Sequence, residues 1–188
     1  MSNDKLNIAV VGSTGFVGLE LIYLLTKHPN VKIKYLCSQN NIGKNINNFD
    51  KRIKRKFPKL CNIKNVNWNT VNLLFLSLPT GRAQSIIKKL YNKFEHLNFI
   101  DLSADFRLKS PTEFKKWYSS RHQAQKLIDK SIYSIPELNT KNLSNYRIIS
   151  NPGCYATSIQ LALKPLIKKN LIKNNRITID SKSGYSGA

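Results

Sequence analysis

The sequence predicts an α/β protein: a Rossmann-type, doubly wound parallel sheet followed by the start of a second α/β (α+β) domain. Short apolar runs of strand length alternate with segments of helical periodicity along most of the 188 residues. The run at 72–79 is almost entirely apolar, which is typical of a strand buried on both faces of a parallel sheet. The first apolar run leads into GSTGFVG, at 12–18, a pattern typical of a phosphate-binding turn between strand and helix.

The elements follow one another with short links. The helix that starts at Ser110 has a strong beginning, because Ser110 can cap it and Pro111 suits the first helical position. Another helix should follow Cys154. The expected strands are 6–12, 31–36, 72–79, 98–103, 146–151 and 175–184, and the other expected helices are 16–27, 81–94 and 110–120. Because a glycine-serine loop directly after a strand is a poor place for a domain to end, we expect the chain to be a fragment of a longer protein.

The chain is strongly basic, with 31 Lys and Arg against 10 Asp and Glu and a formal net charge of +21. The densest basic run is KRIKRKFPK, at 51–59, while other lysines lie on the polar faces of predicted helices. We interpret this charge as a solvated surface that can help capture anionic small molecules. A basic nucleic-acid-binding module is the alternative, but it would need a contiguous cationic face with interleaved aromatic residues.

Other classes of protein lack their signature here. No apolar run is long enough to span a bilayer, and the N-terminus has no signal-peptide pattern, so we expect a cytoplasmic protein without membrane contact. The cysteines form no CxxC pair, which suits a reducing compartment. No metal-ligand spacing occurs, and we expect no metal site. The residues concerned are Cys37, Cys61, Cys154, His28, His96 and His122.

The glycine-rich turn is the candidate cofactor site. Glycines allow the backbone to approach a pyrophosphate closely, and the following helix N-terminus supplies N–H donors and a positive dipole. A glycine turn without a ligand is the alternative. The residues expected to bind the cofactor are Gly12, Ser13, Thr14, Gly15, Phe16, Val17 and Ser38.

The end of the second strand favours NADP over NAD. A site for NAD usually carries an Asp or Glu there, to bind the ribose hydroxyls. Here the sequence reads YLCSQNNIGK and contains no acid, so Ser38, Gln39 and Lys44 could accept a 2′-phosphate. The alternative is that this segment is only a polar loop.

Cys154 is the candidate nucleophile. It directly follows Asn-Pro-Gly and precedes a helical pattern, so it should lie at an accessible turn before a helix N-terminus. Amides at that position favour a thiolate and can hold an oxyanion on an attacked carbonyl. A buried thiol at a turn is the alternative for Cys154. Cys37 ends a strand and Cys61 lies in a loop, so we interpret both as core or surface thiols.

Six short stretches occur in a recognisable order. They are GSTGFVG (12–18), LSLPTG (76–81), DLSADFRL (101–108), YSIPEL (133–138), NPGCYATS (151–158) and SGYSGA (183–188). In this order they resemble the N-acetyl-gamma-glutamyl-phosphate reductases of arginine biosynthesis, which belong to the aspartate-semialdehyde dehydrogenase superfamily. The resemblance runs from Leu6 to Ala188.

The resemblance implies an NADPH-dependent reduction of N-acetyl-L-glutamyl 5-phosphate, a small acyl phosphate, to the 5-semialdehyde and phosphate. Cys154 would carry the acyl group as a thioester, and Arg107 would bind the substrate phosphate; a surface arginine in a salt bridge is the alternative for Arg107. Ser183 and Gly184 would lie near the nicotinamide. The resemblance also implies a homo-oligomer, with an NAD(P)-binding domain at 1–149 and the beginning of a catalytic and dimerisation domain at 150–188.

The sequence departs from the family pattern at two places. Gln39 stands where the family usually has a basic residue. The family's acid–base histidine lies beyond residue 188, so we assign no histidine to catalysis and expect these 188 residues alone to be inactive. Two related enzymes of the same chemistry remain open as alternatives: an N-acetyl-aminoadipate-phosphate reductase and an aspartate-semialdehyde dehydrogenase.

Overall fold

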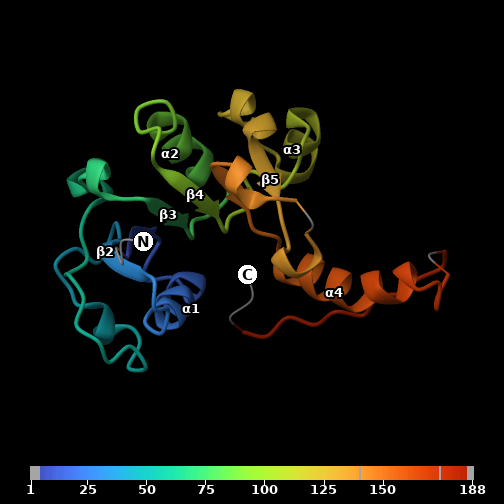
Figure 1. Cartoon of the computed structure of the whole chain (residues 1–188), viewed down its shortest axis with the longest axis horizontal. Helices are drawn as coiled ribbons and strands as arrows, with labels where there is room; N and C mark the ends of the chain where they lie inside the picture. Colours follow the sequence, from blue (N-terminus) through green and yellow to red (C-terminus); the bar gives the residue numbers. More distant parts are fainter. Residues whose placement is uncertain (1–4, 140, 174, 186–188) are drawn as a thin grey trace.

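A six-stranded, fully parallel sheet forms the centre of the protein, in the strand order β2-β1-β3-β4-β6-β5 (Figure 1). The computed structural model describes residues 5–139, 141–173 and 175–185. Because all strands are parallel, their carboxyl ends lie along one edge of the sheet. The strands are β1 (Leu6–Val11), β2 (Val31–Cys37), β3 (Leu73–Leu76), β4 (Asn98–Asp101), β5 (Ser131–Tyr133) and β6 (Ile148–Ser150).

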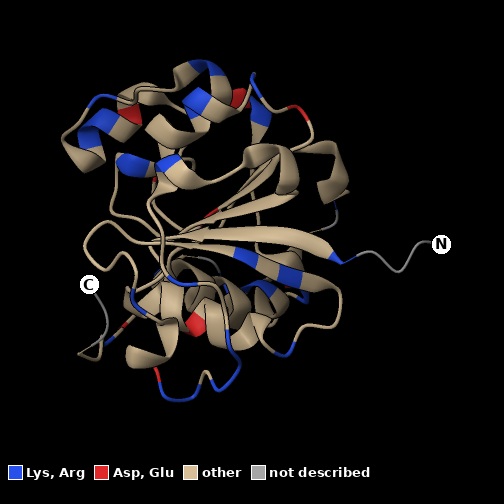
Figure 2. Ribbon diagram, turned by 90° about the vertical axis from the view of Figure 1, so that its left-hand side faces the viewer, with Lys and Arg blue, Asp and Glu red and all other residues tan. Residues whose placement is uncertain are grey.

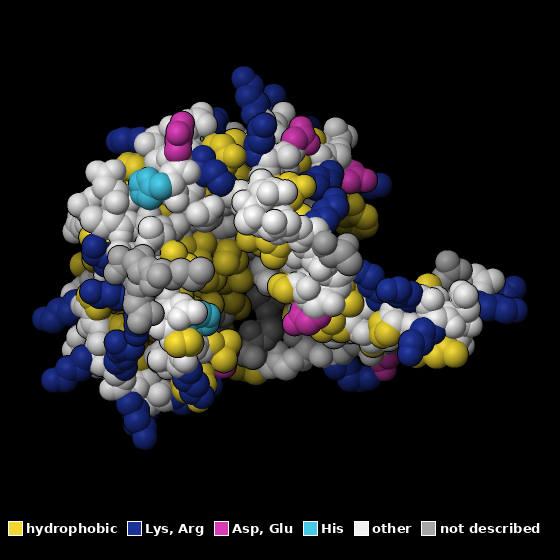
Figure 3. All heavy atoms as spheres, viewed as in Figure 1, with side chains coloured by type: hydrophobic (Ala, Val, Ile, Leu, Met, Phe, Trp, Pro, Cys, Tyr) yellow, Lys and Arg dark blue, Asp and Glu magenta, His cyan; other side chains and the backbone are white. Residues whose placement is uncertain are grey.

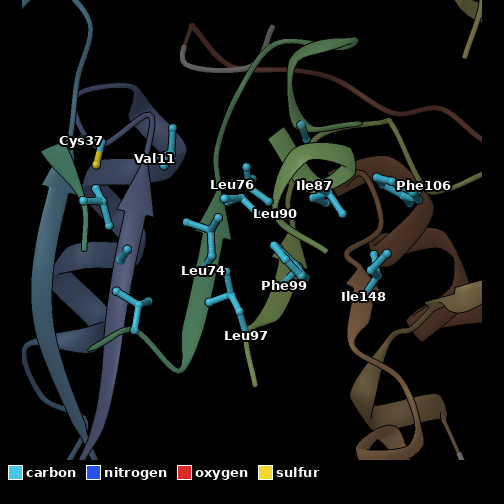
Figure 4. Packing of buried hydrophobic residues seen from close by; sticks show 14 of the residues in the cluster. Val11, Cys37, Leu74, Leu76, Ile87, Leu90, Leu97, Phe99, Phe106 and Ile148 are labelled. Carbon is cyan, nitrogen blue, oxygen red and sulfur yellow. The ribbon is translucent and has the colours of Figure 1, made fainter. Parts of the chain in front are cut away.

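Helical segments cover both faces of the sheet, which Figure 2 shows nearly edge-on. Side chains of a strand point alternately to its two faces. Ile8 and Val10 of β1 therefore pack with Ile22 of the first helix, while Ala9 and Val11 pack in the cluster that contains Ile87 of the second (Figure 4). The helices are α1 (Phe16–Leu25), α2 (Arg82–Leu90), α3 (Pro111–Tyr118) and α4 (Cys154–Lys168).

The predicted fold class is confirmed, and the predicted cap of α3 is present. The Glu113 amide donates to the Ser110 hydroxyl over 3.3 Å, with Pro111 at the start of the helix. A short strand at 131–133 was not predicted. Its three residues pair with β6 at the edge of the sheet and are too few to show a period.

The predicted strand at 175–184 is wrong. These residues have no regular secondary structure, and Ile177 and Ile179 are 37% and 49% exposed. Alternating β-branched residues do not make a strand without a neighbouring backbone to pair with, and no partner strand lies beside them in the described residues. No helix within the described ranges is long and apolar enough to cross a membrane.

Candidate cofactor and active site

The glycine-rich turn joins β1 to α1. At two of its positions, Gly12 and Gly18, the neighbouring backbone leaves no room for a side chain. Gly12 has a φ of +86°, and a Cβ there would lie 1.9 Å from the Ser77 carbonyl oxygen, just beyond β3. A Cβ on Gly18 would lie 2.2 Å from the Gly12 carbonyl oxygen. The two glycines therefore let the backbones that follow β1 and β3, and the first turn of α1, come into close contact.

The N-terminus of α1 offers open hydrogen-bond donors. Gly15 is its N-cap and supplies no side-chain cap, and Phe16 and Val17 are 63% and 56% exposed. Within the described residues their amides have no hydrogen-bond partner. The turn lies where the chain order reverses between β1 and β3, which is the crevice where doubly wound sheets bind nucleotides. These residues fit the pyrophosphate of a dinucleotide.

Polar side chains continue the site along the end of β2. The Thr14 hydroxyl lies 3.3 Å from the Ser38 hydroxyl and 3.5 Å from the Asn41 amide nitrogen. Lys44 Nζ donates to Asn41 Oδ1 over 3.0 Å. Ser13 differs from its neighbours, because it is buried and its hydroxyl donates to the Val10 carbonyl, so its side chain is used inside the protein.

Cys154 is the first residue of α4 and is exposed to solvent. The preceding Gly153 is the N-cap and supplies no side-chain cap. The amide and the hydroxyl of Thr157 both donate to the Gly153 carbonyl over 2.9 Å, which fixes the first turn of the helix. The predicted position of this cysteine at an accessible helix N-terminus is therefore what the structure shows.

Arg107 lies beside the cysteine turn. Its Nε donates to the Asn151 carbonyl over 3.0 Å, and its Nη2 donates to the Leu102 carbonyl over 3.2 Å. Nη1 is turned toward Gly153, since a Cβ on that glycine would lie 3.1 Å from it. Nη1 has no hydrogen-bond partner in the described part of the chain, so one edge of a fixed guanidinium remains open to an anion.

A buried carboxylate that was not predicted from the sequence, that of Asp101, orders the loop that follows β4. Asp101 accepts hydrogen bonds from the amide and hydroxyl of Ser103 at 2.9 and 2.6 Å, and from the Phe106 amide at 3.3 Å. Its own carbonyl accepts the Asn151 amide over 2.8 Å. Burial raises the pKa of Asp101 to about 6, against the opposing effect of the Ser103 hydrogen bonds. Asp101 is a polar residue at the end of an otherwise apolar strand, and this position is the feature of the sequence that could have identified it.

The histidines are not gathered at this site, and His122 lies in the protein core. His122 is 2% exposed and packs edge-on against Phe106 and Phe114, with ring centroids at 5.3 and 4.9 Å. Its Nε2 donates to the Asp105 carbonyl over 2.8 Å, and burial lowers its pKa. His28 and His96 are exposed. The described residues contain no cluster of potential metal ligands.

Ser183 and Gly184 do not lie at the glycine-rich turn. Both are exposed, and a Cβ on Gly184 would meet no atom within 4 Å. No hydrogen bond joins either residue to α1 or to Cys154 in the part of the chain that the structure describes. The end of this predicted loop, residues 186–188, lies outside the described residues.

Comparison with known families gives two matches. The model of "Semialdehyde dehydrogenase, NAD binding domain" matches residues 7–146, and that of "Semialdehyde dehydrogenase, dimerisation domain" matches residues 154–188. A protein of Oryza sativa named "Probable N-acetyl-gamma-glutamyl-phosphate reductase, chloroplastic" is 40% identical over 188 residues, which cover 100% of this chain and 45% of the rice protein. The N-acetyl-gamma-glutamyl-phosphate reductase of Brachyspira hyodysenteriae is 41% identical, with 97% and 53% covered. The chain thus spans about half the length of these curated relatives.

Among solved structures, the aspartate semialdehyde dehydrogenase with NADP from Candida albicans has a TM-score of 0.61 and 18% identity, over 88% of this chain and 48% of that one. The aspartate semialdehyde dehydrogenase II of Vibrio cholerae also has a TM-score of 0.61, with 20% identity. At this level of identity the likeness supports the fold alone.

Proposed function

Because the chain belongs to the semialdehyde dehydrogenase family, we propose that it forms part of a reductase that converts N-acetyl-L-glutamyl 5-phosphate to N-acetyl-L-glutamate 5-semialdehyde and phosphate. The identity of about 40% to enzymes named for this substrate supports the choice within the family. One observation carries the chemistry: an exposed cysteine at a helix N-terminus, beside an arginine whose Nη1 has no partner in the described residues. This pair suits an acyl phosphate, which presents a carbonyl and a phosphate together.

In the proposed reaction the Cys154 sulfur attacks the acyl carbonyl. A carbon–sulfur bond forms, the bond from that carbon to the phosphate oxygen breaks, and phosphate leaves. The amides at the start of α4 hold the oxygen that gains charge during the attack. Arg107 orients the phosphate through Nη1 while its other two nitrogens stay bound to backbone carbonyls. After reduction of the acyl group, the carbon–sulfur bond breaks and the aldehyde leaves the regenerated thiolate.

We propose NADP as the cofactor, which supplies the hydride when bound in the reduced form. The amides of Phe16 and Val17 would hold its pyrophosphate, in the turn formed by Gly12, Gly15 and Gly18. Lys44, held by Asn41 next to Thr14 and Ser38, places a cation at the end of β2 where an NAD site would carry an acid. That chemistry suits a 2′-phosphate.

We also propose that residues 1–149 form the cofactor domain and that residues 150–188 begin a catalytic and dimerisation domain. Helix α4 has no buried residue, although it carries Tyr155, Leu161 and Leu166, which are 43%, 38% and 38% exposed. These exposed apolar side chains need a further surface to cover them, supplied by the rest of the domain or by a second copy. The match of residues 154–188 to a dimerisation domain supports a homo-oligomer. A cytoplasmic site of action agrees with the free thiols at 37, 61 and 154.

The anionic partner in this proposal is a small molecule and not a nucleic acid. Lys and Arg are spread over both helical layers (Figure 2), and in the face that Figure 3 shows they lie mostly around its outer margin. Within the basic run at 51–59, Arg52 is paired with Asp50 and Glu20, and Ile53 is buried in the core. Part of this run is therefore packed against the domain. Only a shorter cationic segment is left to contact a nucleic acid.

Replacement of Cys154 tests the proposed reaction. In the full-length enzyme assayed in the phosphorolytic direction, NADPH formation from N-acetyl-glutamate semialdehyde, NADP and phosphate should fall roughly 1,000-fold or more in Cys154→Ser, because the nucleophile is removed. NADPH binding, followed by its fluorescence, should be retained. Ser158→Ala is the matched control, because Ser158 is exposed one turn further along α4, and it should keep near-normal rates. Near-normal turnover in Cys154→Ser would exclude a thioester on this residue. Rates with the aspartyl and aminoadipyl analogues would identify the substrate.

A further inference from the structure

Two thiols that are 24 residues apart in sequence face each other next to the glycine-rich turn. Cys37 ends β2, and Cys61 lies in an extended segment that pairs with it in parallel. Their sulfur atoms are 3.8 Å apart. We propose that Cys37 and Cys61 are a modification site, at which a peroxide oxidises the two thiols to a reversible disulfide. This proposal is independent of the proposed reaction and does not involve Cys154.

The backbone already holds the two residues in a suitable arrangement. The Cys61 amide donates to the Leu36 carbonyl over 2.9 Å, and the Ser38 amide donates to the Cys61 carbonyl over 3.1 Å. Paired strands lie about 4.8 Å apart, which is within the range of about 4.4–6.8 Å between Cα atoms that a disulfide requires. The sulfurs, at 3.8 Å, must approach to about 2.05 Å. Rotation of the two side chains, with a small shift of the segment that contains Cys61, can provide this movement. That segment can shift because it pairs with β2 at a single bridge.

Exposure decides which sulfur reacts first. Cys37 is 2% exposed, and burial, together with the neighbouring Cys61, raises the pKa of its thiol, so it stays protonated at neutral pH. Cys61 is only partly buried and is the thiol that a small oxidant can reach. Its sulfur attacks one peroxide oxygen, the O–O bond breaks, and water leaves, so that Cys61 becomes a sulfenic acid.

The second step closes the disulfide. The Cys37 thiol attacks the Cys61 sulfur, the S–O bond breaks, and the Cys37 proton passes to the departing oxygen, which leaves as a second water. Two thiols thus lose two electrons and two protons, and one hydrogen peroxide becomes two waters. A dithiol reverses the reaction by exchange.

The position of the pair gives the modification a route to the cofactor turn. The Cys37 carbonyl accepts the amides of both Gly12 and Ser13, each over 3.1 Å. In Figure 4 the Cys37 side chain lies beside Val11, at the same end of the sheet. A disulfide at Cys37 would therefore form at the residue whose carbonyl is hydrogen-bonded to the first two residues of the glycine-rich turn.

The experiment uses Cys154→Ser, so that Cys37 and Cys61 are the two cysteines left among residues 1–188. The protein is exposed to hydrogen peroxide, blocked with iodoacetamide, and digested with trypsin without reduction. We expect the peptides 35–44 and 60–64 to be joined, with a mass two hydrogens below their sum, and dithiothreitol should separate them. In guanidinium chloride the joined pair should form at least tenfold more slowly, because only the folded chain holds the sulfurs together.

Cys61→Ser in the same background is the control, and it should leave Cys37 alkylated by iodoacetamide only after unfolding. The proposal is overturned if the folded protein yields Cys61 as sulfinic acid with Cys37 still a thiol. It is equally overturned if the joined peptides form at the same rate in the unfolded chain. Neither outcome bears on turnover by Cys154, so failure here is distinct from failure of the proposed function.

Discussion

Gly12→Ala should destabilise the protein far more than the same change at another glycine of like conformation. Gly12 and Gly43 have φ angles of +86° and +81°, so an added methyl group brings a similar backbone strain of about 1–2 kcal/mol at either position. The surroundings differ. A Cβ on Gly12 would lie 1.9 Å from the Ser77 carbonyl oxygen, while a Cβ on Gly43 meets nothing within 4 Å.

The overlap at Gly12 sets the size of the expected difference. Real Cβ contacts are essentially never shorter than 3.0 Å, so the backbones after β1 and β3 must separate by at least 3.0 − 1.9 = 1.1 Å. Overpacking in a close-packed core costs about 1–3 kcal/mol. We therefore expect the free energy of unfolding of Gly12→Ala to lie about 2 kcal/mol below that of Gly43→Ala. Urea denaturation with a common m-value measures this difference. Equal midpoints for the two variants would refute the close packing of the glycine turn.

Two further predictions concern charged groups. Because burial raises the pKa of Asp101 to about 6, its ionisation is penalised in the folded state. The contribution of Asp101 is fully present below the unfolded pKa of about 3.9 and is lost as pH rises through about 6. Relative to Asp101→Asn, which cannot ionise, the parent protein should lose about 2 kcal/mol of unfolding free energy between pH 4 and pH 7, as measured by urea denaturation at both pH values; a constant difference would contradict the burial argument. Lys44→Met should weaken NADPH binding roughly five- to tenfold and leave NADH binding unchanged. Lys54→Met, which removes the same charge from the exposed basic run, should change neither affinity in a fluorescence titration.

The features that could be predicted from sequence are those encoded within a few residues. The turn at Gly12 needs its glycines because of local backbone conformation, and Cys154 is placed by the Asn-Pro-Gly that precedes it. Contacts between distant segments were not predictable in this way. The apposition of Cys37 and Cys61 depends on how a 23-residue loop returns to β2, and no periodic pattern within that loop reports it. The strand predicted at 175–184 failed for the same reason, because it depends on a partner.

The strand order decides whether the candidate active site exists at all. β5 precedes β6 in the chain, yet β6 lies between β4 and β5 in the sheet. This order places the loop after β4, which carries Arg107, directly beside the loop after β6, which leads to Cys154. If the strands followed the chain order, β5 would separate the two loops by one further strand spacing of about 4.8 Å. Arg107 could not then donate to the Asn151 carbonyl over 3.0 Å. Each motif was readable from the sequence alone, but their combination into one site follows from the connection after β5, which returns the chain to pair with β4.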